Sequence, residues 1–209
     1  MLLYLRMHRS SFPSYKAVLV PRLSQYWKME AANMVAVPGL VVWAVIRSGN
    51  PISLSLIVAM AAACFMLLIG TFALRIKLET ARGRRPFGQR WLPWLSQAQW
   101  PALVLVVAAV AGAGFQLWVD GRWSGVAIAT VVCSLLAVLE YINYYHVQLQ
   151  NFDHMPDLKR FLAGGGFRES HLAKALRSFR ARKRRLNTAE EQAGHEQRPA
   201  SALSRPKAD

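Results

Sequence analysis

The chain has 209 residues, 54% of them hydrophobic, and its 26 Lys and Arg against 11 Asp and Glu give a formal net charge of +15. Two cysteines without a CxxC pair exclude a disulfide framework. The P-loop, GxGxxG, HExxH and GxSxG motifs do not occur, so nothing points to nucleotide-binding, zinc-protease or serine-hydrolase chemistry.

Residues 1–30 precede the first long apolar segment and are expected to form a cytoplasmic or interfacial arm. The apolar start, Met1–Leu5, is shorter than the apolar region of a signal peptide and precedes its charges, so we expect it to be retained. The stretch Tyr15–Met29 mixes apolar and basic side chains, which is typical of a segment lying along a membrane surface.

Four apolar segments follow, and a membrane-spanning helix needs about 20 residues. Three segments reach this length directly, and the first reaches it with Trp27–Glu30 and Arg47 as interfacial flanks. None alternates with the period of a strand. The sequence therefore predicts an all-α integral membrane protein with a four-helix transmembrane bundle over residues 31–145. The predicted spans are 31–46, 52–74, 101–119 and 125–145, with a basic loop at 75–100.

The positions of Lys and Arg predict the orientation of the chain, because loops rich in them stay in the cytoplasm. Residues 1–30 carry five, residues 75–100 carry six and the tail after Tyr145 carries thirteen, whereas the two short connections carry only Arg47 and Arg122. We expect two antiparallel hairpins with both termini in the cytoplasm, in a plasma membrane or bacterial inner membrane. All seven tryptophans lie at predicted interfaces, where indole rings are favoured.

Small residues are expected to let the helices approach closely, as in many membrane proteins. Ala59 and Ala63 provide such a pair on the second segment, and Ala108 with Gly112 and the neighbouring Ala109 with Ala113 provide two on the third. Pro38 lacks a backbone donor and predicts a kink in the first helix, which serves either packing or a transporter hinge. The two cysteines lie at membrane depth and are expected to be buried and inert.

Glu140 is the residue that insertion into a membrane does not explain. It lies about 22 Å along a helix that starts at Gly125, still inside a hydrocarbon core of about 30 Å. At 100° per residue it shares one helix face with Asn143 and Tyr144, whereas His146 lies about 120° away. The sequence therefore predicts an intramembrane polar site. Its predicted members are Glu140, Asn143, Tyr144, His146, Arg75 and Lys77.

An intramembrane carboxylate is costly and normally turns toward a partner or a wet cavity. Arg75, Lys77 and Lys28 are the candidate partners, and the simplest interpretation is an ion pair of Glu140 with Arg75 that holds the fourth helix against the second. The functional alternatives are a proton relay, an ion or lipid-headgroup site, or a metal site shared with His146. A metal needs three convergent ligands, and the fourth segment has no second His one turn away.

Residues 146–186 are expected to form a cytoplasmic region beside the membrane. A short helix is predicted around Pro156–Leu162, followed by a flexible joint at Gly164–Gly166. Leu172, Leu176 and Phe179 then recur at helical spacing, which predicts a basic amphipathic helix. Its predicted anionic-lipid-binding residues are Lys174, Arg177, Arg180, Arg182, Lys183, Arg184 and Arg185. Residues 187–209 are polar and are expected to be disordered.

These observations leave two functional hypotheses. The favoured one is a non-catalytic membrane anchor or accessory subunit whose basic arms contact anionic lipid and a protein partner. The alternative is a small transporter, proton-relay or lipid-headgroup-processing protein that uses Glu140, Asn143 and Tyr144. We expect no cofactor, and nucleic acid is a less favoured partner because no aromatic side chains alternate with the basic ones. An enzyme with a cytosolic active site is disfavoured because no cytoplasmic segment is long enough to bury a core.

Overall fold

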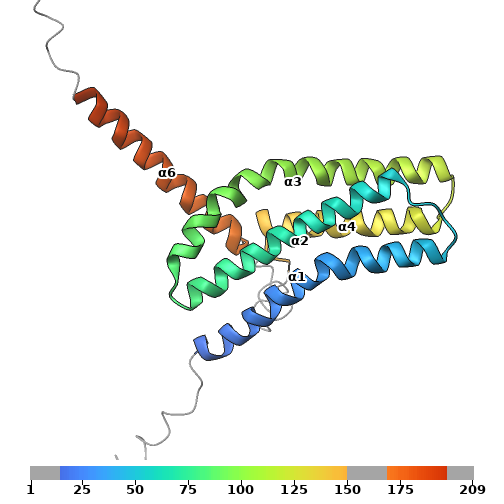
Figure 1. Cartoon of the computed structure of the whole chain (residues 1–209). Coiled ribbons are helices and arrows are strands. Elements are labelled where there is room, and N and C mark those ends of the chain that lie inside the picture. The colour runs from blue at the N-terminus through green and yellow to red at the C-terminus, as the bar shows by residue number, and fades with distance from the viewer. Residues whose placement is uncertain (1–14, 150–168, 197–209) are drawn as a thin grey trace, which may run out of the picture.

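The computed structural model describes residues 15–149 and 169–196, which form five α-helices. The only extended pairing in these two ranges is an isolated bridge between Val147 and Glu169. Helices α1 to α4 run side by side, and α6 leaves the bundle at the end where α2 joins α3 (Figure 1). The helices are α1 (Tyr15–Arg47), α2 (Leu54–Ala81), α3 (Arg85–Asp120), α4 (Gly125–Tyr145) and α6 (His171–Glu196).

Four of these helices are long and apolar enough to cross a membrane. Their outer faces carry large exposed apolar side chains, which suit contact with lipid tails rather than water. The predicted all-helical class, with four helices long and apolar enough to span a membrane, is confirmed, whereas the predicted topology and orientation of the termini stay predictions. The candidate spans are Leu19–Arg47, Leu54–Ala81, Phe87–Asp120 and Gly125–Tyr145.

The helices extend further than the apolar segments do. The predicted interfacial stretch Tyr15–Met29 is continuous with the first span in α1, which passes through Pro38 without a break. The predicted basic loop 75–100 is helical except for a turn at Arg82–Arg84, because Arg, Lys, Leu and Glu are good helix formers and continue α2. Gly83 makes this turn with a φ of 83°, a conformation that other residues seldom adopt.

The α2–α3 turn is held by Glu79, a nearly buried carboxylate near the end of α2. It pairs with Arg82 at 3.1 Å and with Arg84 at 3.5 Å. Beyond the turn, the first part of α3 bends away from the rest of the helix (Figure 1). Pro93 and Pro101 lie inside α3, and each removes one backbone hydrogen bond, which accounts for the bend.

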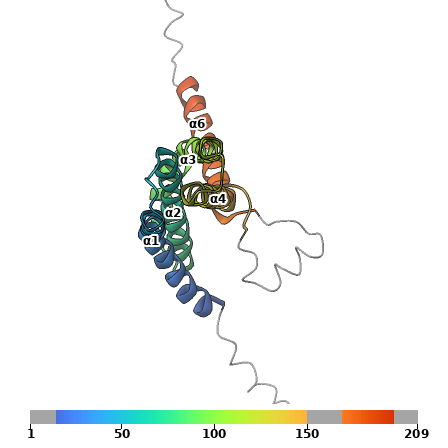
Figure 2. The same cartoon turned by 90° about the vertical axis from the view of Figure 1, so that its right-hand side faces the viewer.

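Helix α2 is the central element of the bundle. It lies between α1 on one side and α3 and α4 on the other (Figure 2). In its most apolar stretch 44% is buried inside the bundle, compared with 6% in that of α1. Of the predicted small residues, Ala59 and Ala63 on α2 and Ala109 and Ala113 on α3 are buried, whereas Ala108 is exposed. Ser134 of α4 donates a hydrogen bond to the carbonyl of Ala109 at 2.9 Å, which joins α4 to α3.

We call the end of the bundle that contains the Arg82–Arg84 turn and the last residues of α4 the basic end. The opposite end contains two short turns, between α1 and α2 and between α3 and α4. Ser53 and Ser124 cap the following helices there, accepting backbone N–H donors at 3.2 and 3.0 Å. These caps fix where α2 and α4 begin.

Candidate functional site

Helix α6 is fastened to the basic end of the bundle by both polar and apolar contacts. Ser170 caps the helix by accepting the N–H of Ala173 at 3.0 Å, and its own hydroxyl donates to the backbone carbonyl of Tyr144. Its N–H also bonds the carbonyl of His146 at 3.1 Å. Leu172 and Leu176 are buried in the same hydrophobic core as α2, α3 and α4. The first half of α6 is thereby docked on the bundle.

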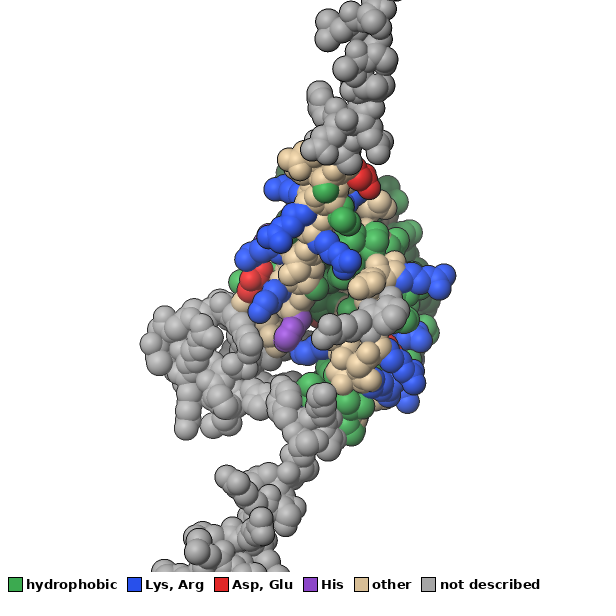
Figure 3. Space-filling model, turned by 90° about the vertical axis from the view of Figure 1, so that its left-hand side faces the viewer, with side chains coloured by type: hydrophobic (Ala, Val, Ile, Leu, Met, Phe, Trp, Pro, Cys, Tyr) green, Lys and Arg blue, Asp and Glu red, His purple; other side chains and the backbone are tan. Residues whose placement is uncertain are grey.

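All seven predicted lipid-binding side chains of α6 are exposed at the basic end (Figure 3). They do not form one face. Arg177, Arg180 and Arg184 line a pocket between α6, the part of α3 around Gln99 and the end of α4. Arg182 and Lys183 line a separate, mainly apolar groove between α6 and the start of α3. The remaining two, Lys174 and Arg185, line neither hollow.

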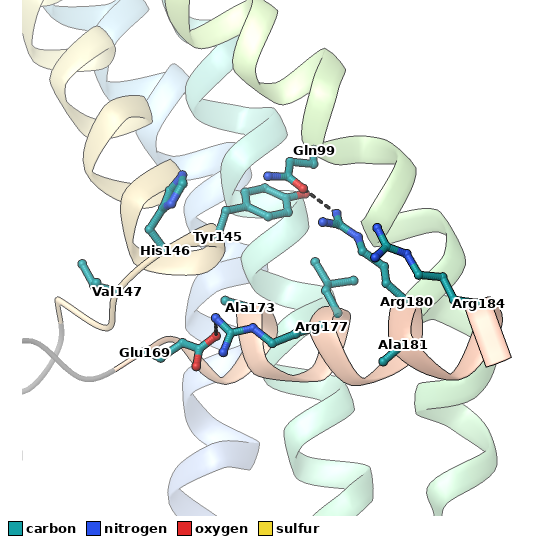
Figure 4. A pocket seen from close by; sticks show the side chains of 11 residues that line it. Gln99, Tyr145, His146, Val147, Glu169, Ala173, Arg177, Arg180, Ala181 and Arg184 are labelled. Atoms are coloured by element: carbon teal, nitrogen blue, oxygen red, sulfur yellow. Dashed lines mark hydrogen bonds and ion pairs between the residues drawn. The ribbon is translucent and has the colours of Figure 1, made fainter.

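The pocket has a volume of about 490 Å³, and we call it the arginine pocket. Figure 4 shows Gln99 and Tyr145 directed toward Arg180. The Arg180 guanidinium donates to Gln99 at 2.6 Å and to Ser96 at 3.2 Å. The residues lining the pocket are Gln99, Tyr145, His146, Val147, Glu169, Ala173, Leu176, Arg177, Arg180, Ala181 and Arg184.

Other contacts fix the walls of the arginine pocket. Arg177 pairs with Glu169 at 2.7 Å across the start of α6 (Figure 4). Tyr145 donates its hydroxyl to the carbonyl of Leu95 at 3.1 Å, which holds the end of α4 against α3. His146, predicted as a member of the intramembrane polar site, instead lies exposed at the end of α4 and lines this pocket.

The predicted polar residues Glu140, Asn143 and Tyr144 do come together inside the bundle. The Asn143 amide donates to the Glu140 carboxylate at 3.5 Å, and its oxygen accepts the N–H of Leu149 at 2.9 Å. Tyr144 donates its hydroxyl to the Glu30 carboxylate of α1 at 2.6 Å. Glu140 lies close enough to interact with both Glu30 and Tyr144. We call Glu30, Glu140, Asn143 and Tyr144 the carboxylate cluster.

Gly70 of α2 makes room for the carboxylate cluster. A Cβ atom at this position would lie 2.5 Å from the Glu30 carboxylate oxygen and still closer to the Tyr144 hydroxyl. Real Cβ atoms essentially never approach other atoms this closely. The Glu30–Tyr144 hydrogen bond therefore depends on a residue without a side chain at position 70.

The predicted ion pair of Glu140 with Arg75 is not formed. Arg75 is exposed, and its guanidinium lies over the rings of Trp27 at 5.4 Å and Phe87 at 5.1 Å. Gly70 lies at the depth of the cluster, and Arg75 is five residues further along α2, which places it about 7.5 Å nearer the basic end and about 140° round the helix. Lys77 lies further still along α2.

The ion pairs among residues 15–149 and 169–196 involve Glu79 and Glu169 rather than Glu140. Within the same ranges, no three His, Cys, Asp or Glu side chains come close enough to hold a metal ion. The predicted short helix at Pro156–Leu162 and the joint at Gly164–Gly166 lie outside the described residues. Helix α6 itself continues past Leu186 to Glu196, into the stretch expected to be disordered.

No protein-family model, curated protein or solved structure matches this chain. Its function therefore rests on the chemistry of its own two polar sites, the basic surface of α6 and the carboxylate cluster.

Proposed function

We propose that the protein is a multi-pass membrane protein that serves as an anchor or accessory subunit by binding anionic lipid headgroups through α6. The observation that carries this proposal is the docking of α6. Seven exposed cations lie on a helix whose first turns are buried against the membrane-spanning core through Leu172 and Leu176. The docked turns hold the nearest of these cations, Lys174, Arg177 and Arg180, at the basic end of the bundle rather than on a free tail.

Distance from the membrane decides how much such charges contribute. Each Lys or Arg near an anionic leaflet contributes about 1 kcal/mol, and the attraction fades within a Debye length of about 8 Å at physiological salt. Seven cations would then supply several kcal/mol in total. With both termini in the cytoplasm, as the Lys and Arg distribution predicts, α6 would meet the anionic inner leaflet of a plasma or bacterial inner membrane.

The distal half of α6 suits the other part of the proposal, a protein partner. Its side chains from Ala181 to Glu190 are all exposed, so this length of helix buries none of them against the described chain. The charge of α6 changes along this half, from the basic run Arg182–Arg185 to Glu190. A partner helix with the complementary order of charges would fit it.

The test measures stabilisation of the full-length protein by lipid. The thermal unfolding midpoint in detergent micelles is compared after adding phosphatidylglycerol or phosphatidylcholine. We expect phosphatidylglycerol to raise the midpoint more, because only it attracts the α6 cations. A variant with Arg182→Gln, Lys183→Gln and Arg185→Gln removes three of the seven cations and should lose somewhat less than half of this difference. The control variant, Arg47→Gln with Arg122→Gln, removes charges outside the basic end and should keep it.

Two results would refute the proposal. The first is equal stabilisation of the wild-type protein by the two lipids. The second is an equal loss of the phosphatidylglycerol effect in the α6 variant and in the control variant, because the attraction would then follow net charge rather than the position of α6.

A second candidate function, a proton relay, is favoured by the carboxylate cluster. The Tyr144 hydroxyl bonds Glu30 and lies close to Glu140, so a proton could pass between carboxylates on α1 and α4 through this hydroxyl. Intramembrane ionisable groups commonly mark such paths.

Proteoliposomes loaded with a pH-sensitive dye test this second function. We expect the wild-type protein to dissipate an imposed pH gradient faster than Glu140→Gln or Tyr144→Phe does. Glu79→Gln serves as the control, since Glu79 lies at the α2–α3 turn and should not alter the flux. A wild-type rate equal to that of protein-free liposomes would remove the relay from consideration.

A further inference from the structure

The arginine pocket differs from the rest of the α6 surface because three elements contribute residues to its lining. Gln99 comes from α3, Tyr145 and His146 come from the end of α4, and the three arginines come from α6 (Figure 4). Arg177, Arg180 and Arg184 follow one another at intervals of three and four residues, which places them on one face of the helix. Figure 4 shows the guanidinium groups of Arg180 and Arg184 near each other and that of Arg177 turned toward Glu169, so an anion in this pocket would lie between two arginines with a third positive charge beside them.

The charge of the pocket matches a doubly charged anion. Its three arginines carry three positive charges, and Glu169 is the one carboxylate among its lining residues. With His146 neutral, the formal charge of the lining is therefore +2. A phosphate monoester carries about −1.5 to −2 charges at neutral pH, whereas a phosphate diester carries one.

Two of the three guanidinium groups, those of Arg177 and Arg180, are also positioned before any ligand arrives. Arg180 uses two of its five N–H donors on Ser96 and Gln99, which leaves three for a ligand. Arg177 is held by Glu169. The side chain of Arg184 makes no ion pair or hydrogen bond to another described residue, so its donors are available. Arginines fixed in this way bind phosphate oxygens in pairs and lose little rotamer freedom in doing so.

The position of the pocket relative to the membrane surface indicates where its phosphate ligand comes from. Gln99 is followed directly by Trp100, which is 72% exposed, as expected for an indole at the level of the lipid headgroups. Tyr145 is the last residue of the α4 span. Gln99 and Tyr145, which line the pocket, therefore lie at the level where the phosphates of a bilayer would be.

We propose that the arginine pocket is a specific site for a phosphate monoester group, carried by a membrane lipid of the phosphatidic acid type. The inference rests on the proposed function, because it names the headgroup that α6 binds best. It goes beyond general attraction, since a diester headgroup such as that of phosphatidylglycerol has one charge fewer and an alcohol substituent on the phosphate. Free phosphate monoesters share the chemistry, and the experiment separates them from the lipid.

The experiment measures binding of defined lipids to the full-length protein in micelles by native mass spectrometry. The probes are phosphatidic acid, phosphatidylglycerol and phosphatidylcholine, with glycerol 3-phosphate as the soluble monoester. We expect phosphatidic acid to bind at least about tenfold more tightly than phosphatidylglycerol, a difference of about 1.4 kcal/mol. Tight binding of glycerol 3-phosphate alone would assign the pocket to a soluble ligand and overturn the lipid source.

Arg184→Gln is the decisive variant, because its side chain takes no part in docking α6. It should remove most of the preference for phosphatidic acid while leaving the unfolding midpoint without lipid unchanged. Arg180→Gln, which also loses the bonds to Ser96 and Gln99, should remove the preference with some loss of stability. The matched control, Arg185→Gln, removes the same charge from the adjacent position outside the pocket and should keep the preference.

The outcomes separate this inference from the proposed function. Equal binding of phosphatidic acid and phosphatidylglycerol, both above phosphatidylcholine, would overturn the pocket and leave the α6 lipid surface intact. An Arg185→Gln effect as large as that of Arg184→Gln would overturn the pocket in the same way. Equal binding of all three lipids would overturn both.

Discussion

Replacing Gly70 with alanine tests the carboxylate cluster more directly than removing any of its polar groups. The added Cβ would overlap the Tyr144 hydroxyl and the Glu30 carboxylate, so at least one of them has to move. Overpacking of this kind costs about 1–3 kcal/mol. The Glu30–Tyr144 hydrogen bond would be lost as well, at about 0.6 kcal/mol on average and up to about 1.7 for interhelical bonds in membranes.

Alanine also favours the helix over glycine by about 0.5–1 kcal/mol, which offsets part of this loss. The net effect of Gly70→Ala should be a destabilisation of roughly 1–4 kcal/mol. Gly114→Ala is the matched control, because Gly114 also lies inside a membrane-spanning helix and a Cβ added there would meet no neighbouring atom within 4 Å. The control variant gains the helix propensity without the overlap and should be as stable as the wild type or more so.

The assay is unfolding by SDS in mixed micelles, followed by circular dichroism. A second substitution, Tyr144→Leu, removes the hydroxyl and the Cζ atom that the new methyl group would meet. In that background the cost of Gly70→Ala should fall by about 0.5–3 kcal/mol, the usual coupling of residues in contact. The reasoning fails if Gly70→Ala unfolds at the same SDS fraction as Gly114→Ala, or if its cost is unchanged by Tyr144→Leu.

Three further predictions address the ion pairing of the cluster, the cap of α6 and the orientation of the chain. The effects of Glu140→Gln and Arg75→Gln on SDS unfolding should add within about 0.5 kcal/mol, because the two residues do not pair; recovery of stability in the double variant would argue for a direct ion pair. Ser170→Ala should cost about 0.5–2 kcal/mol in the docking of α6, seen as faster hydrogen exchange in its first turn while α2 is unchanged; equal exchange would contradict the role of this cap. A reporter fused after Asp209 should be cytoplasmic, and an external signal would reverse the predicted orientation.

The four membrane-spanning helices could be predicted from sequence because lipid imposes one simple requirement, a long apolar run that satisfies its own backbone. The same reasoning placed the helix boundaries poorly. Hydropathy falls where charged residues begin, but the backbone of α2 continues through Arg75 and Lys77 to Ala81 because charged side chains can extend toward water without breaking a helix. The length of an apolar segment therefore indicates how much of a helix lies in the hydrocarbon core, and not where the helix ends.

The carboxylate cluster could be predicted only in part. Glu140 is detectable because it is a charge inside an apolar run, and Asn143 and Tyr144 follow from helical spacing. Glu30 lies beside Lys28 at the start of an apolar segment, which makes it look like an interfacial flank. Its contact with Tyr144 joins residues 114 positions apart, and such a contact leaves no local pattern in one sequence. The arginine pocket could not be predicted for the same reason, since Gln99 and Arg180 come into contact only through packing of α3 on α6.

Tyr144 physically connects the two polar sites, because its two ends bond different elements. The side-chain hydroxyl donates to Glu30 on α1, while the backbone carbonyl accepts the hydroxyl of Ser170, which caps α6. If displacement of Tyr144 by Gly70→Ala weakens the α6 cap, phosphatidic acid should bind that variant less tightly, and by reciprocity the lipid should stabilise the variant less than the wild type. Gly114→Ala should bind the lipid as the wild type does. Unchanged lipid binding in a destabilised Gly70→Ala protein would show that the two sites are energetically independent, since proximity alone does not establish coupling.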